Sequence, residues 1–152
     1  MRHVWIFQMA AAPSAAQKAS IIPQLEAFVA VWKAHGAPVP GEVSLRHEHF
    51  VIVQAEPGHA SGCSIDSMNK GVNDILAQAG IEVLGPERVF FREADGGIGH
   101  IDFKEAKAAI LSGRLNAGST VFDSTLGNTN DLSRWETTLD KTWLGRFLPQ
   151  KA

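Results

Sequence analysis

Hydrophobic positions in the first 86 residues follow two different periods. Apolar runs predict strands at 3–9 and 81–84, and the segment 43–56 predicts two strands joined by a turn at 47–49. Between these runs, apolar residues recur at spacings of three and four, which is the period of an amphipathic helix. One such helix is predicted from Ile21, Ile22, Leu25, Phe28, Val29 and Trp32, and another from Ile65, Met68, Val72, Ile75, Leu76 and Ala79.

Both predicted helices are flanked by residues of the kinds that commonly start or end a helix. Ser20 is the candidate N-cap of the first helix, with Pro23 in the first turn, and Ser64 is the candidate N-cap of the second helix. Gly36 and Gly80 are the candidate stops, because glycine readily adopts the left-handed conformation that ends many helices.

The resulting order is strand, helix, strand, strand, helix, strand. This order is typical of a ferredoxin-like α+β sandwich, in which two helices cover one face of an antiparallel sheet, so we expect such a unit over residues 1–86. The expectation depends on the turn at 47–49, which lacks the Asn-Gly signature of a tight hairpin, and one long strand over 43–56 is the alternative. A single cysteine excludes an iron–sulfur cluster held by four thiolates of one chain, so no cofactor is implied.

A second pattern begins after residue 86. Its predicted elements are a strand at 88–94, an Asp-Gly-Gly turn, a strand at 98–103, a helix at 104–113, a strand at 119–125 and helices at 130–139 and 140–148. Asp102 and Glu105 form a D-x-x-E start signal, and Gly113 is a stop signal for the central helix. We therefore expect a smaller α+β half over residues 87–152.

The segment "GGIGHIDFKEAKAAILSGRLNAGSTVFDS", followed by a tryptophan, resembles the GYF-like modules of bacterial proteins over about residues 89–135. The resemblance implies a surface for proline-rich peptides, although the chain lacks the Gly-Tyr-Phe triplet, the Gly-Pro-Phe segment and any tyrosine. Trp135, Trp143 and Phe147 are the candidate partner-binding residues. The alternative is that their rings anchor the C-terminal helices to the sheet.

Five short segments, "HVWIFQ", "VWKAHG", "SGCSID", "TVFDS" and "WLGRFL", carry a second resemblance over nearly the whole chain. They resemble a family of small bacterial proteins, known mainly from Bacteroidetes, whose members are often labelled ABC transporter ATPases and which has no established activity. A nucleotide-binding subunit needs G-x-x-x-x-G-K-[ST] to wrap phosphates with backbone amides and a lysine. The comparable "PGHASGCS" has no lysine after its second glycine, so an ATPase is not expected.

Composition and charge narrow the class of protein further. The chain has 152 residues, 45% of them hydrophobic and 20% charged, with a net charge of -2, which is typical of a soluble globular protein. Lys and Arg are scattered singly among Asp and Glu, so nucleic acid is not expected as a partner. No apolar run reaches the length of a membrane span, and the one before Gln8 is too short for a signal peptide. We expect a cytoplasmic protein with no membrane partner.

Candidate chemistry centres on the lone cysteine, in "EPGHASGCSIDSMNK". If Ser64 caps a helix, Cys63 precedes the cap, and its sulfur either packs against Met68 or turns toward open amides that stabilise a thiolate. Asp66 in the first turn repels a thiolate and favours packing. The candidate ligand-binding residues, for an anion above all, are His59, Gly62, Cys63, Ser64 and Asp66.

Metal binding and triad catalysis have weaker support at the same place. His47, His49, His59 and Cys63 match no metal-ligand spacing, so no metal is expected. Ser61, Ser64, His59 and Asp66 are the residue types of a triad, but G-x-S-x-G is missing.

We therefore expect a non-enzymatic binding or adaptor protein with a protein or peptide partner, or with self-association as a homo-oligomer. The alternative is a small thiol-dependent enzyme or anion-binding protein centred on Cys63.

Overall fold

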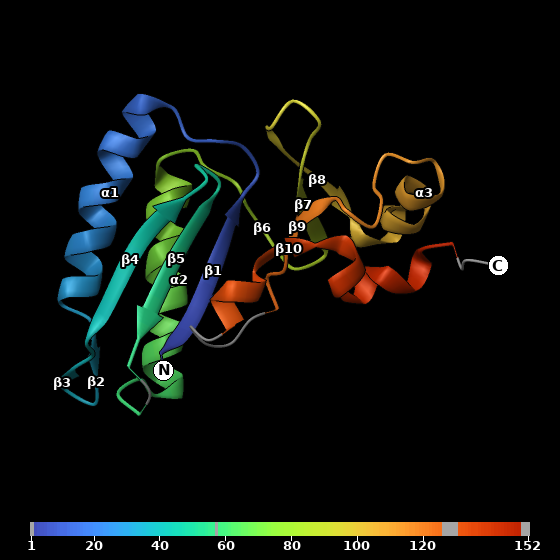
Figure 1. The fold of residues 1–152 in the computed structure, drawn as a ribbon. Coiled ribbons are helices and arrows are strands. Elements are labelled where there is room, and N and C mark those ends of the chain that lie inside the picture. Colours follow the sequence, from blue (N-terminus) through green and yellow to red (C-terminus); the bar gives the residue numbers. More distant parts are fainter. Residues whose placement is uncertain (1, 57, 126–130, 150–152) are drawn as a thin grey trace. The chain divides into compact units, whose positions relative to one another are not determined.

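A computed structural model describes residues 2–56, 58–125 and 131–149, and it has an α+β fold built of helices and antiparallel sheets (Figure 1). The chain divides into two compact units, and the division falls between Leu84 and Gly85. We call the described residues up to Leu84 unit 1 and those from Gly85 unit 2. No helix in these ranges is long and apolar enough to cross a membrane.

Unit 1 contains two long helices and a four-stranded sheet. Its elements are β1 (His3–Met9), α1 (Ala15–Ala30), β2 (Lys33–Ala34), β3 (Ala37–Pro38), β4 (Gly41–Arg46), β5 (Phe50–Ala55), α2 (Gly62–Gln78) and β6 (Val83–Leu84). The strand order in the sheet is β4-β5-β1-β6, and each pair of neighbours is antiparallel. The small β2–β3 hairpin stands apart from this sheet.

The two helices pack side by side on one face of this sheet (Figure 1). Alternate strand residues point toward them, as the two-residue period of a strand requires. The core residues are Phe7, Met9, Val51, Val53 and Ala55 from the strands and Ile21, Leu25, Val29, Met68, Val72 and Leu76 from the helices.

The turn between β4 and β5 confirms the prediction of two strands. His49 N donates to Arg46 O at 3.2 Å, and the two residues between them, His47 and Glu48, have φ values of 51° and 59°. Positive φ at both central positions matches the twist of antiparallel strands, and Asn-Gly is only the commonest sequence that supplies it. The turn therefore forms although the sequence has no Asn-Gly pair at this position.

Helix α1 begins earlier than predicted, so Ser20 is not its N-cap. Ser14 caps it in a reciprocal box, in which Gln17 N donates to Ser14 Oγ at 3.1 Å and Ser14 N donates to Gln17 Oε1 at 2.8 Å. Pro23 consequently lies inside the helix and not in its first turn. Gly36 does not end the helix either, since it forms the β2–β3 turn with a φ of 80°.

Unit 2 holds a second four-stranded antiparallel sheet, in the order β10-β9-β7-β8. Its elements are β7 (Arg88–Arg92), β8 (Ile98–Asp102), the 3-10 segment η1 (Phe103–Glu105), α3 (Ala106–Leu111), β9 (Thr120–Phe122), η2 (Asp131–Arg134), β10 (Glu136–Thr138), η3 (Leu139–Lys141) and η4 (Trp143–Phe147). The hairpin around Asp95 and the stop at Gly113, with a φ of 84°, are as predicted. Asp102 caps the 3-10 segment η1, where its carboxylate accepts a hydrogen bond of 2.9 Å from Lys104 N, and the α-helix begins later than predicted, at Ala106.

The described parts of the segments 130–139 and 140–148, both predicted to be helices, contain only short 3-10 helices and one strand. In the described part of the first segment, the 3-10 segment η2 is followed by the strand β10. This strand pairs with β9, and Thr137 lies opposite Val121. The second segment forms two short 3-10 turns. β-branched Thr137 and Thr138 fit a strand better than a helix, and a pairing partner distant in sequence decides the outcome.

Candidate functional site

The predicted Cys63 site lies at the start of α2, but Ser61 and not Ser64 is the N-cap. Ser64 N donates to Ser61 Oγ at 3.2 Å, and Ser61 N donates to Ser64 Oγ at 2.7 Å. Cys63 is therefore the second residue of the helix, and its side chain is exposed. The prediction that its sulfur packs against the buried Met68 is wrong, because the cap falls three residues earlier than expected.

The other residues of this candidate site have separate surroundings. Ser64 is buried, and its carbonyl oxygen accepts a hydrogen bond of 2.9 Å from Trp32 Nε1, so it ties α2 to the chain that follows α1. Asp66 is the fifth helical residue and is exposed, as are His59 and Gly62. No group of three or more His, Cys, Asp or Glu residues in the described ranges is placed to hold a metal ion.

The three predicted partner-binding residues differ in their exposure. Trp135 is only 2% exposed, and its ring lies 5.1 Å from that of Phe122, so it does not present a ring at the surface. Trp143 is 41% exposed, and Phe147 is partly exposed. The candidate surface therefore depends on η4 and not on Trp135.

Trp143 and Phe147 form an aromatic cluster with Arg146. The two rings meet edge to face, with centroids 6.0 Å apart and an interplanar angle of 77°. Arg146 Cζ lies 5.6 Å from the Trp143 centroid and 6.0 Å from the Phe147 centroid, and Arg146 Nε donates to Trp143 O at 3.1 Å. We call Trp143, Arg146 and Phe147 the aromatic surface.

The local chain geometry explains why Trp143 faces outward. Thr142 caps η4, since its Oγ1 accepts from Leu144 N at 3.3 Å and donates to Leu139 O at 2.7 Å. Leu144 is 2% exposed and points into the core of unit 2. Gly145 lets the segment approach η3 closely, because an added Cβ there would lie 2.9 Å from Asp140 O.

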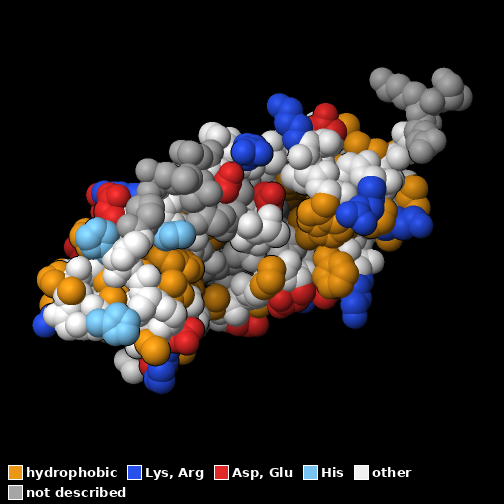
Figure 2. Space-filling model, turned by 90° about the horizontal axis from the view of Figure 1, so that it is seen from below, with side chains coloured by type: hydrophobic (Ala, Val, Ile, Leu, Met, Phe, Trp, Pro, Cys, Tyr) orange, Lys and Arg blue, Asp and Glu red, His pale blue; other side chains and the backbone are white. Residues whose placement is uncertain are grey.

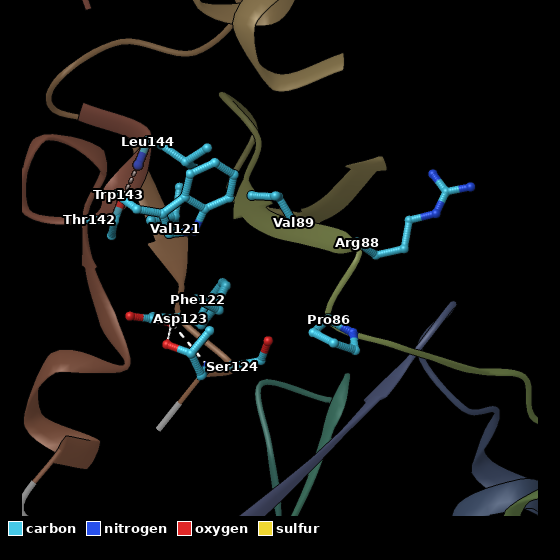
Figure 3. Close-up of a pocket in the computed structure, with 11 residues that line it drawn as sticks. Pro86, Arg88, Val89, Val121, Phe122, Asp123, Ser124, Thr142, Trp143 and Leu144 are labelled. Carbon is cyan, nitrogen blue, oxygen red and sulfur yellow. Dashed lines mark hydrogen bonds between the residues drawn. The ribbon is translucent and has the colours of Figure 1, made fainter. Parts of the chain in front are cut away.

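A shallow recess lies beside the aromatic surface, between β7, β9 and the start of η4 (Figure 3). The ring of Trp143 extends across Val121 toward Val89, whereas the side chain of Arg88 points away. Asp123, on the far side, accepts a hydrogen bond of 3.0 Å from Thr125 N. The recess measures about 30 Å³, room for about one water molecule and far below the roughly 300–1,000 Å³ of small-molecule sites.

A larger hollow occurs in unit 1, between α1 and β4. It measures about 320 Å³, and its lining is mostly apolar: Ile21, Ile22, Leu25, Glu26, Val43, Ser44, Leu45 and Val51. We call it the α1–β4 groove. The sequence does not predict this groove, because apolar residues at the open edge of a core follow the same periodicity as residues buried inside it.

Three described side chains near the surface have shifted pKa values, each because of an ion pair. Hydrogen bonds to Glu42 and Glu56 raise the pKa of Arg2, and a hydrogen bond to Asp74 raises that of Lys70. The hydrogen bond from Lys18 lowers the pKa of Glu48. None of these groups belongs to the aromatic surface or to the start of α2, so the shifts mark ordinary surface pairs.

Acidic and basic side chains are interspersed on the face that Figure 2 shows. Among the side chains described there, Lys and Arg lie in small groups with Asp and Glu nearby and form no broad basic area.

The sequence matches no known family model, no curated protein and no solved structure.

Proposed function

We propose that this chain is a non-enzymatic binding module whose aromatic surface accepts an extended, proline-containing segment of a partner protein. The observation that carries the proposal is the exposure of Trp143, a residue that is 41% exposed while its ring contacts Phe147 and Arg146. A large ring held in one orientation at the surface loses little conformational entropy when a ligand covers it.

The chemistry of the surface suits such a ligand. Proline-rich segments form a polyproline II helix, whose flat rings pack on exposed aromatic side chains and whose carbonyl oxygens stay free to accept hydrogen bonds. Trp143 offers the packing surface. Arg146 offers guanidinium donors beside it, and Thr142 and Asp123 supply polar groups at the recess.

The alternative of a thiol-dependent enzyme or anion-binding protein has less support. The exposed Cys63 has no base or carboxylate hydrogen-bonded to its sulfur among the contacts of the described residues, and Ser61 and Ser64 already satisfy each other's amides.

We also propose the finer fold classes and the cellular setting that the sequence predicts. The strand order β4-β5-β1-β6 supports a ferredoxin-like unit 1. The hairpin, the α3 helix with Gly113 shortly after its end, and the following β9 support a GYF-like unit 2. Membership in the mainly Bacteroidetes family and a cytoplasmic location remain predictions.

The proposal is tested by calorimetric titration of the protein with a panel of proline-rich peptides. Trp143→Ala should weaken binding of the best peptide about 30-fold, as expected for an interface residue worth about 2 kcal/mol. The matched control is Phe103→Ala, because Phe103 is a 42% exposed aromatic of the same unit outside the aromatic surface, and it should leave binding unchanged. Equal effects of the two variants, or no binding of any peptide, would contradict the proposal.

A further inference from the structure

Strand β4 is an open edge of the unit 1 sheet. It has six residues and pairs with β5 on one side, whereas no other strand of the described residues pairs with its second side. An edge strand presents a row of backbone donors and acceptors that another strand can satisfy. The opposite edge, β6, has only two residues and offers much less.

The sequence of β4 is complementary to itself in antiparallel pairing. With Ser44 opposite Ser44 of a second copy, Val43 lies opposite Leu45 and Glu42 lies opposite Arg46. The two-fold axis repeats each pair, so the contact holds two apolar pairs and two pairs of opposite charge. Cross-strand pairs of these kinds stabilise antiparallel sheets.

The charges at both ends of β4 are available for such pairs. The side chain of Glu42 is 65% exposed and shares the single Arg2 guanidinium with Glu56, at 2.9 Å in each case. Because the two carboxylates of Glu42 and Glu56 share the one positive charge of Arg2, the net charge at this end of β4 is negative. Arg46, at the other end, is exposed and forms no ion pair with the described residues.

The helix side of the same edge is apolar and open. Val43 and Leu45 line the α1–β4 groove of about 320 Å³ together with Ile22, which is 37% exposed. In a symmetric pair, the grooves of the two copies meet across the new strand pairing. The apolar side chains of one copy would then cover those of the other, which removes exposed apolar area from water.

We propose that two copies of this chain associate through β4, in antiparallel pairing centred on Ser44, to form a continuous sheet across a two-fold axis. A second copy is the occupant because the strand supplies its own complement in both charge and apolar pattern. This interaction lies in unit 1 and is independent of peptide binding at the aromatic surface.

The test is sedimentation of the full chain between about 10 µM and about 1 mM, a range that covers weak and transient dimers. The wild type should shift from monomer toward dimer with rising concentration. Glu42→Arg and Arg46→Glu should each weaken the dimer about tenfold, because each places like charges opposite each other twice. Lys70→Glu, a charge reversal on α2, is the matched control and should leave the equilibrium unchanged.

Mixing the two weakened variants gives the decisive result. Glu42→Arg presents two positive ends and Arg46→Glu presents two negative ends, so a mixed pair has only opposite charges in contact. The mixture should recover a dimer of near wild-type strength, and circular dichroism confirms that each variant is folded. A wild type that stays monomeric, a dimer that ignores both substitutions, or a mixture that fails to recover would each overturn the proposal.

Discussion

Unit 1 and unit 2 each contain a four-stranded antiparallel sheet, but they support it differently. In unit 1 the three main strands have six or seven residues, and helices of 16 and 17 residues cover one face. In unit 2 the strands have three to five residues, and the only α-helix described there has six. Short 3-10 segments complete the cover of unit 2.

The side chains differ in the same way. Unit 1 is filled mainly by aliphatic residues at regular spacing. Unit 2 adds rings that meet arginines, with Arg114 Cζ 5.2 Å from the Phe91 centroid and Arg92 Cζ 5.6 Å from that of Phe122. Arg146 continues this pattern at the surface, over Trp143. The long strands of unit 1 leave β4 as an open edge, whereas the short 3-10 segments of unit 2 hold Trp143 partly exposed.

The largest expected effect is a loss of stability on truncating a buried leucine, and it shows whether the cores of the two units are equally tightly packed. Leu76 in α2 and Leu139 in η3 are both 0% exposed, so replacing either by alanine should lower the free energy of unfolding by about 2–5 kcal/mol. Denaturant titration of Leu76→Ala and Leu139→Ala measures both. A cost below about 1 kcal/mol for Leu139→Ala alone would show that unit 2 is loosely packed at its 3-10 segments.

The next effect concerns the buried hydrogen bond of unit 1. Trp32→Phe removes the Nε1 donor and leaves Ser64 O without it in a buried position, so stability should fall by about 1–3 kcal/mol. Trp5→Phe is the control, because Trp5 lies edge-on to Trp32 at 5.8 Å and is only partly buried. Thermal unfolding of both variants should show a clearly larger loss for Trp32→Phe, and an equal loss would refute the role of the hydrogen bond.

A similar effect is expected at the close contact between η3 and η4. Gly145→Ala places a Cβ 2.9 Å from Asp140 O and should cost about 1–2 kcal/mol of stability while weakening peptide binding, because η4 carries the aromatic surface. Gly62→Ala, at the first position of α2, meets nothing within 4 Å and serves as the control. If Gly145→Ala binds and unfolds as the wild type does, η4 does not depend on this contact.

The smallest effect is expected at the lone cysteine. Because Cys63 is exposed on the first turn of α2, Cys63→Ala should change stability by less than about 0.5 kcal/mol and leave peptide binding unchanged. Iodoacetamide should label the thiol at the same rate in folded and unfolded protein. Much faster labelling of the folded protein would indicate an activated thiol and favour the enzyme alternative.

Sequence patterns predicted the main strands and both helices of unit 1, because these elements are long enough for their period to be read. The errors are both helix starts, the stop at Gly36 and the β2–β3 hairpin, which was not predicted. The first turn of α1 faces solvent, so its apolar period begins only at Ile21, whereas the capping box at Ser14 and Gln17 marks the true start. The same kind of box, formed by Ser61 and Ser64, was missed at α2 because serine takes the place of the usual glutamate.

Unit 2 was harder to predict because partners distant in sequence decide its structure. Residues 136–138 pair with β9 and so form a strand in a segment with a helix-like pattern. Trp143 was a candidate by residue type alone. Its exposure follows from the 3-10 geometry that buries Leu144 and from the contact at Gly145, neither of which a sequence pattern contains. Arg146, whose guanidinium lies over both rings, was missed for the same reason.

The most direct test of the proposed function uses the four tryptophan indole N–H signals in a two-dimensional NMR titration with a proline-rich peptide. Trp5 and Trp32 belong to unit 1, Trp135 is buried in unit 2, and Trp143 alone belongs to the aromatic surface. We expect the Trp143 indole signal to shift most, in proportion to bound peptide, while the signals of Trp5 and Trp32 stay in place. A peptide that binds and shifts the Trp5 or Trp32 signal without moving that of Trp143 would contradict it.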